Sequence, residues 1–319
     1  MPVDVVALGE LLIDFTPAGK SAAGHSLFEQ NPGGAPANVL VALSRLGGTG
    51  GFIGKVGNDQ FGGALKQVLD ENGVETKGLV FENEANTTLA FVHLDETGDR
   101  SFSFYRKPGA DIMLRPEEIN YDLIDMAKIF HFGSLSLTDE PSRTATISAV
   151  EYGKSKGKII SYDPNWRPPL WRSNDAAKEG MLRGLQYADI VKLSEEELYF
   201  LTGSSDLDSG TVGLLASGIS LVVVTLGAKG CYYRYGGGFG CLPGYRVDAV
   251  DTTGAGDGFV GALLYHISRL ECSVSQVPRE QLEGMLNFSN AVGALVTTKA
   301  GAIPAMPTLA EVQRFIESS

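Results

Sequence analysis

The residues Asp251-Thr252-Thr253-Gly254-Ala255-Gly256-Asp257 stand directly before a long apolar stretch, Gly258–Ile267. Small residues at the start of a helix leave backbone N–H groups open, and the helix dipole adds positive potential, so this pattern indicates an anion site. Asp257 falls in the first helical turn, beside the anion. One carboxylate next to one anion site suits phosphoryl transfer to a hydroxyl. Ordinary helix capping by Thr and Asp is the alternative explanation.

Short apolar runs alternate with amphipathic stretches around this motif. The runs are rich in β-branched residues and predict buried strands at Val3–Leu8, Gly51–Val56, Lys128–Phe132, Lys158–Tyr162, Ile190–Leu193 and Leu221–Thr225. The amphipathic stretches predict helices at Pro36–Leu46, Gln60–Asn72, Ser142–Lys156, Asn174–Tyr187 and Ser194–Thr202. Towards the C-terminus, Cys231–Val250 predicts more β-structure, and helices are expected at Asp257–Arg269, Glu280–Thr298 and Thr308–Ser318. The alternation predicts an α/β fold with a mostly parallel sheet between helices.

Two segments depart from this alternation, and we expect them to form a lid inserted into a single domain of residues 1–319. The first covers approximately residues 11–35 and is strand-like without a helix. The second covers approximately residues 86–112 and contains a predicted hairpin, Thr87–Arg106, with its turn at Glu96-Thr97-Gly98-Asp99. A half-exposed hairpin of this kind is either an extension of the sheet edge or a separate flap, and flaps commonly cover a substrate and exclude water from the chemistry.

Composition narrows the class of protein. The 319 residues are 43% hydrophobic and 20% charged, so a sizeable core is expected. The net charge of −12 disfavours nucleic-acid binding and attachment to an anionic membrane surface. Three scattered cysteines (Cys231, Cys241 and Cys272) favour a reducing compartment. The N-terminus lacks the pattern of a signal peptide, so we expect a cytoplasmic protein.

Several common motifs are missing from the sequence. Gly9 is not followed by the G-x-G-x-x-G spacing of a dinucleotide-binding turn, and Gly254-Ala255-Gly256 lacks the third glycine. No P-loop, no G-x-S-x-G elbow and no H-E-x-x-H helix occurs in the chain. The usual dehydrogenase, serine hydrolase and metalloprotease classes are therefore disfavoured.

The D-T-T-G-A-G-D motif resembles the C-terminal signature of the ribokinase/PfkB family of carbohydrate kinases. A match to the N-terminal signature of that family, Gly33-Gly34-Ala35-Pro36-Ala37-Asn38, lies more than 200 residues earlier. Further segments, among them Gly9–Phe15, Phe52–Gly62, Ser161–Arg167 and Val224–Gly230, are most similar to the fructokinase subgroup, and the resemblance extends over essentially the whole chain. It implies a ribokinase-like three-layer α/β/α sandwich with a small β-sheet lid.

The resemblance also implies roles at matching positions. Asp257 would be the catalytic base, with the anion hole formed by the backbone at Gly254, Ala255, Gly256 and Asp257. The sugar would be held by Asp14, Gly33, Gly34 and Asn38, with Asn165 and Arg106 nearby. Arg167 would face the ATP phosphates. For Arg106 and Arg167, a solvated surface charge is the alternative.

The same resemblance implies nucleotide and metal sites. The nucleotide would contact Lys192, Ser194, Thr225, Gly227, Gly254, Gly256 and Asn290. Glu197 would organise Mg²⁺ through water, although Ser194 replaces the asparagine usual in that motif and Glu197 equally suits an acidic first helical turn. Asp251, the Thr253 carbonyl and Gly301 resemble a monovalent-cation site for K⁺.

The expected activity is transfer of the ATP γ-phosphoryl group to the 6-hydroxyl of fructose, that is, fructokinase activity. Three alternatives remain at this stage: a kinase for another sugar such as 2-keto-3-deoxygluconate or ribose, a non-catalytic family member used as a binding module, and a generic nucleotide-binding or redox protein. We also expect a homodimer, formed through the lid.

Overall fold

A nine-stranded sheet in the order β13-β12-β11-β10-β9-β8-β1-β4-β5 forms the centre of the protein, in a computed structural model that describes residues 3–94 and 100–319. Its pairings are parallel from β5 to β11 and antiparallel at β11–β12 and β12–β13. This confirms the predicted α/β class. The strands are β1 (Val3–Leu8), β4 (Gly50–Gly57), β5 (Glu75–Glu82), β8 (Ala127–Gly133), β9 (Ile159–Asp163), β10 (Ile190–Ser194), β11 (Leu221–Thr225), β12 (Cys231–Tyr235) and β13 (Gly238–Leu242).

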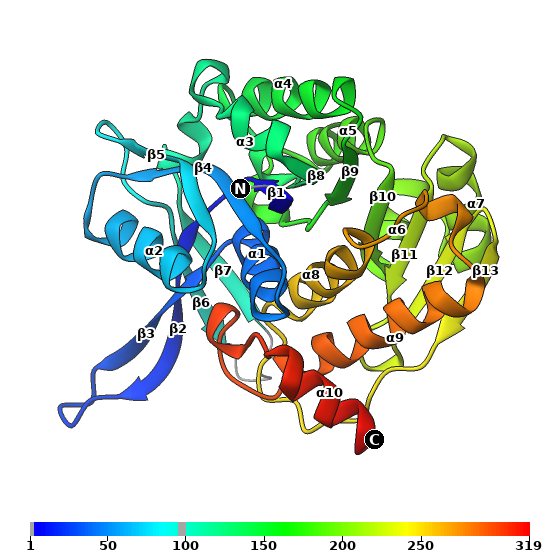
Figure 1. Cartoon of the computed structure of the whole chain (residues 1–319). Helices are drawn as coiled ribbons and strands as arrows, with labels where there is room; N and C mark the ends of the chain where they lie inside the picture. Colours follow the sequence, from blue (N-terminus) through cyan, green and yellow to red (C-terminus); the bar gives the residue numbers. More distant parts are fainter. Residues whose placement is uncertain (1–2, 95–99) are drawn as a thin grey trace.

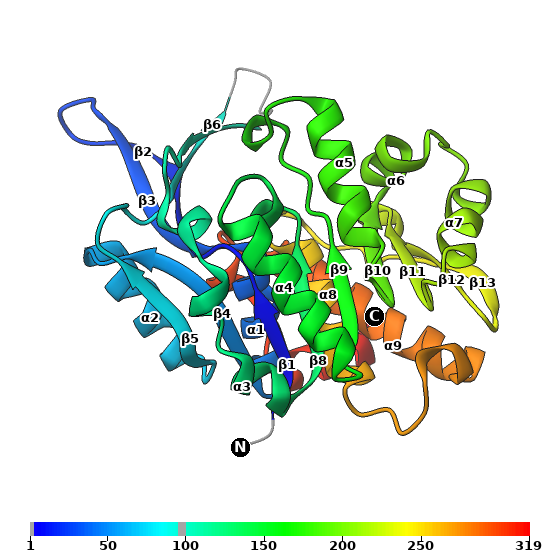
Figure 2. The same ribbon diagram turned by 90° about the horizontal axis from the view of Figure 1, so that it is seen from above.

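Helices cover both faces of this sheet, and each face has its own apolar core (Figures 1 and 2). One core packs the sheet against α1 (Ala35–Arg45), α2 (Gln60–Glu71), α8 (Ala255–Ile267), α9 (Arg279–Val296) and α10 (Leu309–Glu317). The other packs it against α3 (Tyr121–Met126), α4 (Ser142–Ser155), α5 (Asn174–Leu185), α6 (Glu195–Thr202) and α7 (Leu207–Ala216). The result is the expected three-layer sandwich.

A second, four-stranded sheet lies beside the first, in the order β3-β2-β6-β7. It is built from β2 (Leu12–Lys20), β3 (Ser26–Gly33), β6 (Leu89–Leu94) and β7 (Arg100–Tyr105). The blue β2–β3 arm projects from the body of the protein (Figure 1). These strands fall within the two segments assigned to a lid, although their action as a lid remains a prediction. The predicted turn at residues 96–99 lies outside the described residues.

Candidate active site

The D-T-T-G-A-G-D motif forms the turn that enters α8. Gly254 is the N-cap residue, with a φ of 78°, and an added Cβ would lie 2.7 Å from the Ala302 side chain. Only glycine fits this left-handed and crowded position. Gly254 offers no side-chain cap, so the first-turn amides are left for a bound group, except that the Ala255 N–H makes a long 3.3 Å bond to the Thr252 carbonyl.

Asp257 is the third residue of α8, and its carboxyl group is buried. Its Oδ2 accepts a hydrogen bond of 2.7 Å from Nδ2 of Asn38, in the first turn of α1. Burial raises the pKa of Asp257 to about 6, and Asp163 adds to this rise, whereas Asn38, Lys192 and Arg167 oppose it. A carboxylate with this pKa is ionised at neutral pH and accepts a proton more readily than an ordinary aspartate.

A buried ion pair lies beneath the start of α8. Nζ of Lys192, on β10, is 2.9 Å from Oδ2 of Asp163 at the end of the neighbouring strand β9. A Cβ added at Gly256 would lie 3.0 Å from the same Nζ, so the ammonium group is directly adjacent to the anion hole. Burial lowers the pKa of Lys192, but the Asp163, Glu197 and Asp257 carboxylates outweigh it, and the net shift is upward. Lys192 therefore remains a cation.

The second sheet contributes the wall of the site that faces the start of α8. Asp14 lies on β2, where a Cβ at Gly33 would collide with its carboxylate. Burial raises the pKa of Asp14 to about 6; Arg167 opposes the rise, and Asp257 and Asp251 add to it. Arg167 and Asp257 are thus close enough to Asp14 to act on its charge, so Asp14 belongs to the same site as the start of α8. Oδ1 of Asn38 is buried and has no hydrogen-bond partner within residues 3–94 and 100–319, so this wall contains an unpaired acceptor.

The segment after β9 carries Asn165, Trp166 and Arg167. Asn165 adopts a positive φ of 47°, and its N–H donates to Oδ1 of Asp163. The Trp166 N–H donates to Oε1 of Glu197 at 2.7 Å, and the indole stacks on Phe200 of α6 with ring centroids 4.0 Å apart. This segment is therefore anchored to α6 and holds Arg167, which acts electrostatically on both carboxylates of the site. Arg167 is half-buried, so it is not the fully solvated surface charge that was the alternative to a site residue.

Glu197 and Ser194 form a capping box at the start of α6. Oε2 of Glu197 accepts from the Ser194 N–H at 2.7 Å, while the Ser194 hydroxyl accepts from the Glu197 N–H. With the Trp166 bond, both oxygens of Glu197 receive backbone hydrogen bonds. The helix-start alternative for Glu197 is therefore realised, and water-mediated binding of Mg²⁺ stays a prediction, because each carboxylate oxygen has further acceptor capacity.

Arg106 is buried at the end of β7, so its surface alternative is wrong. Its Nε and one terminal nitrogen bind Oδ2 of Asp111 at 2.8 and 2.6 Å, and further bonds reach the Thr138 hydroxyl and the Leu135 carbonyl. These partners occupy most of the guanidinium donors, so they restrict direct contact between Arg106 and a sugar.

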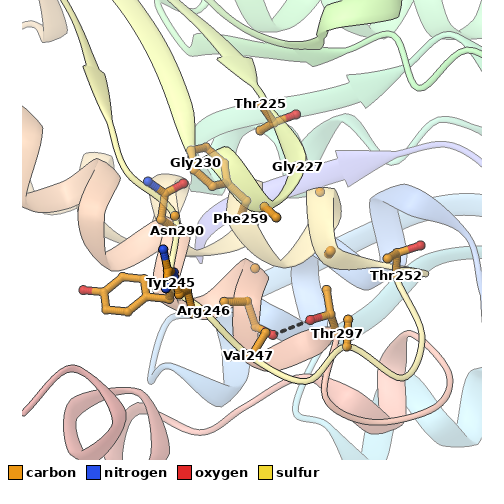
Figure 3. Close-up of a pocket in the computed structure, with 17 residues that line it drawn as sticks. Thr225, Gly227, Gly230, Tyr245, Arg246, Val247, Thr252, Phe259, Asn290 and Thr297 are labelled. Atoms are coloured by element: carbon orange, nitrogen blue, oxygen red, sulfur yellow. Dashed lines mark hydrogen bonds between the residues drawn. The ribbon is translucent and has the colours of Figure 1, made fainter. Parts of the chain in front are cut away.

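An open cavity of about 530 Å³ adjoins the anion hole (Figure 3). The predicted residues Thr225, Gly227, Gly256 and Asn290 line it, whereas Lys192, Ser194 and Gly254 are not among its described lining residues. No motif in the sequence predicted the wall of this cavity that is formed by Tyr245, Arg246, Val247, Ala294 and Thr297. The available signal for the part of this wall on α9 was the pair of small residues Gly293 and Ala294, because they leave room beside the helix.

The proposed cation ligands also come together. Oδ1 of Asp251 accepts from the Thr253 N–H at 2.8 Å, and Oδ2 accepts from the Gly301 N–H at 3.0 Å. The carboxylate thus joins the D-T-T turn to the loop after α9. No cluster of three or more His, Cys, Asp or Glu side chains suited to a metal occurs in the described part of the chain.

A model of the pfkB family of carbohydrate kinases matches residues 3–309. The chain belongs to this family. A probable fructokinase-4 from Arabidopsis thaliana is 48% identical over 318 residues, which cover 99% of this chain and 97% of that protein. Fructokinase-2 from Oryza sativa is also 48% identical, with 99% and 94% covered.

Solved structures of pfkB-type kinases have the same fold. The fructokinase from Xylella fastidiosa with bound ATP has a TM-score of 0.92 and 37% identity, covering 100% of this chain and 99% of that one. The Vibrio cholerae fructokinase bound to fructose, ADP and calcium has a TM-score of 0.88 and 37% identity, with 98% and 99% covered. The aminoimidazole riboside kinase from Salmonella enterica scores 0.85 at 32% identity, with 99% and 100% covered. The ribokinase-like fold is thereby confirmed.

Proposed function

We propose that this pfkB-family kinase transfers the γ-phosphoryl group of ATP to the 6-hydroxyl of D-fructose. The observation that carries the proposal is the buried Asp257 carboxylate, placed at the start of α8 between the anion hole and the wall formed by Asp14 and Asn38. The fructokinase relatives support fructose as the acceptor. ATP in the Xylella structure supports ATP as the phosphoryl donor, and the cavity beside α8 is the proposed nucleotide site because Ala255 and Gly256 of the anion hole line it.

The sugar lies against the second sheet in this proposal. The Asp14 carboxylate accepts hydrogen bonds from two neighbouring hydroxyls, and the open Oδ1 of Asn38 accepts a third. Gly33 and Gly34 pack closely here, since an added Cβ would collide with the Asp14 carboxylate at position 33 and with the Glu10 carbonyl at position 34. Asn165 would contact the sugar from the segment that follows β9. The donors of Arg106 are largely occupied, so Arg106 contributes by fixing the chain that follows β7.

The transfer step uses this chain's own groups. The sugar oxygen attacks the γ-phosphorus, the bond to the β,γ-bridging oxygen breaks, ADP leaves, and the hydroxyl proton passes to Asp257. A carboxylate with a pKa of about 6 is too weak to deprotonate a free alcohol first, so the proton moves late. The amides of the anion hole, Lys192 and Arg167 stabilise negative charge on the transferring group.

Metal ions complete the proposal. Mg²⁺ bound with the nucleotide would neutralise phosphate charge, and Glu197 would hold it through water, using the acceptor capacity that its two backbone hydrogen bonds leave. K⁺ would lie beside Asp251 with carbonyl oxygens of the D-T-T turn and of the loop at Gly301. The buried Asp251 carboxylate between these two segments suits a cation. Potassium in a related Vibrio cholerae fructokinase structure supports this expectation.

A homodimer through the second sheet is part of the proposal. One face of this sheet carries Phe15, Phe28, Phe91 and Tyr105 in ring contact, with centroid separations of 4.8 to 5.5 Å. Phe28 is 41% and Tyr105 67% exposed. An aromatic face this exposed favours burial against a second copy.

No helix among residues 3–94 and 100–319 could span a bilayer. A cytoplasmic location stays a prediction.

The test is ADP release from MgATP with K⁺ and a panel of fructose, glucose, ribose, mannose, 2-keto-3-deoxygluconate and fructose 6-phosphate. Selective turnover of fructose is the expected result. Selective turnover of another sugar would overturn the proposed acceptor and keep the chemistry. Binding of ATP without turnover of any sugar would favour the non-catalytic alternative.

A further inference from the structure

Glu10 is a buried carboxyl group that the proposed chemistry does not use. It follows β1, where the chain leaves the central sheet for β2, and only 3% of the residue is exposed. Its Oε1 accepts a hydrogen bond of 2.9 Å from the Ala35 N–H, which is the first residue of α1. Burial raises the pKa of Glu10 to about 7, so the carboxylate predominates at pH 8.

Helix α1 needs this bond because its own sequence cannot cap it. The N-cap residue is Gly34, which has no side chain, and Pro36 has no N–H. Gly34 has a φ of 116°, and a Cβ there would collide with the Glu10 carbonyl oxygen. A capping side chain has no room at position 34, and Glu10 supplies the acceptor from 25 residues earlier.

The first turn of α1 carries the residue that holds the catalytic base. The Asn38 N–H bonds the Gly34 carbonyl at 2.9 Å, and the Asn38 side chain donates to Asp257. Glu10 is therefore connected to Asp257 through one short turn of helix. The same turn begins at the Gly33-Gly34 pair beside Asp14.

Glu10 also faces the other crossings between the two sheets. Arg106, at the exit from β7, and its partner Asp111 act on Glu10 electrostatically, with opposite signs. Thr88, just before β6, donates to Oδ1 of Asp111 at 2.6 Å. Glu10, Ala35, Thr88 and Arg106 thus mark the four places where the chain passes between the second sheet and the main body.

We propose that Glu10 is a positioning residue for phosphoryl transfer: its carboxylate fixes the first turn of α1, so that Gly33, Gly34 and Asn38 face the sugar and Asn38 orients Asp257. This inference rests on the proposed function. The Glu10→Gln change keeps an acceptor oxygen but loses the stronger charge-assisted bond to the start of the helix. Loss of the Glu10 charge should therefore weaken the use of the sugar and leave the nucleotide site, on the far side of α8, unchanged.

The test compares Glu10→Gln with wild type and with Asp206→Asn at pH 8. Asp206 is the matched control, because it caps α7 by accepting from the Ser209 N–H at 2.8 Å, in a helix that contributes none of the site residues. In E10Q we expect at least a tenfold loss of kcat/KM for fructose, an ATP Kd within twofold of wild type, and faster hydrogen exchange at residues 35–40. D206N should change none of these three quantities.

A double-mutant cycle with Asn38→Ala separates positioning from general stability. Because part of the effect of Glu10 passes through Asn38, E10Q should cost clearly less in the N38A background than in wild type. The inference would be overturned if the losses of kcat/KM in E10Q and N38A multiply fully in the double variant. Unchanged hydrogen exchange at residues 35–40 in E10Q would also overturn it. The exchange measurement needs no sugar, so it still decides the role of Glu10 in α1 if wild type fails to use fructose.

Discussion

The Asn38 side chain donates a hydrogen bond of 2.7 Å to Oδ2 of Asp257, although the two residues lie 219 positions apart. This bond joins the two signature segments of the chain at the reacting end of the site. It fixes one carboxylate oxygen of Asp257 and leaves the other for the substrate hydroxyl. The remaining Asn38 oxygen has no partner among the described residues, so one side chain can orient both the base and the sugar.

Asp257→Asn should strongly lower turnover and preserve nucleotide binding. The amide cannot accept the hydroxyl proton, so kcat should fall about 10²-fold or more. Because a buried carboxylate is replaced by a neutral group, the protein should fold normally, and the ATP Kd should stay within about threefold of wild type. Steady-state ADP release and calorimetric titration with ATP measure the two quantities. Near-normal kcat in this variant would show that another group is the base.

The activity should fall steeply on the acid side of pH 6. Asp257 and Asp14 both have a pKa raised to about 6, and both must be ionised, one to accept the proton and the other to accept two hydroxyls. Lowering the pH below 6 protonates both carboxylates. Glu10, whose pKa is raised to about 7, is already largely protonated at pH 6, so below pH 6 the slope of log kcat/KM for fructose against pH should approach two.

The matched variant for this profile is Asp14→Asn. Its overall kcat/KM should be lower, and its acid slope should fall to one, because only Asp257 still titrates. A slope of one in wild type, or a slope of two that persists in D14N, would contradict the role of Asp14.

Lys192→Met should lower kcat on the order of 10²-fold, since it removes a cation next to the anion hole. It also leaves the Asp163 carboxylate buried without its partner, which costs about 3–5 kcal/mol of stability. Thermal unfolding together with ADP release separates the two effects. Lys66→Met, at an exposed pair on α2, is the control and should change both by little.

The double variant with Asp163→Asn tests which effect dominates. It should restore most of the lost stability, because neither charge remains buried, and it should leave kcat low. Recovery of kcat in the double variant would mean that Lys192 acts only by neutralising Asp163.

Much of the fold could be predicted from local pattern. Six strands of the central sheet and eight helices occur within about two residues of their expected positions, because apolar periodicity is strong there. The strand at Glu75–Glu82 was missed, since it lies at the sheet edge and mixes polar residues with Gly78. Helix Leu207–Ala216 was also missed, because its two glycines and its Ser and Thr are weak helix formers.

The site was predictable where a short motif carries it and not where packing assembles it. Asp257, Asn38 and the glycines stand in contiguous signatures. The contact between Lys192 and the anion hole depends on where β10 lies beneath α8, and the cap from Glu10 to Ala35 depends on a chain crossing. Neither contact leaves a recognisable pattern of residue spacing in the sequence, because the segments that form it are far apart in the chain and meet only when it folds.

A pair of glycines tests how strongly backbone geometry constrains the sugar-binding turn. Gly34→Ala should destabilise the protein by more than about 2 kcal/mol, because residue 34 has a φ of 116° and a Cβ would strike the Glu10 backbone. Gly63→Ala, at an exposed position of α2 with nothing within 4 Å of an added Cβ, should stabilise it by about 0.5–1 kcal/mol. Denaturant unfolding of both variants measures the difference.

The Gly34→Ala change should also affect use of the sugar. An added Cβ at residue 34 would push against the Glu10 backbone, and Glu10 caps α1 at Ala35. G34A should therefore raise the KM for fructose, and G63A should not. Equal stabilities for the two variants would mean that the turn can move aside, and that the glycine there serves approach of the sugar alone.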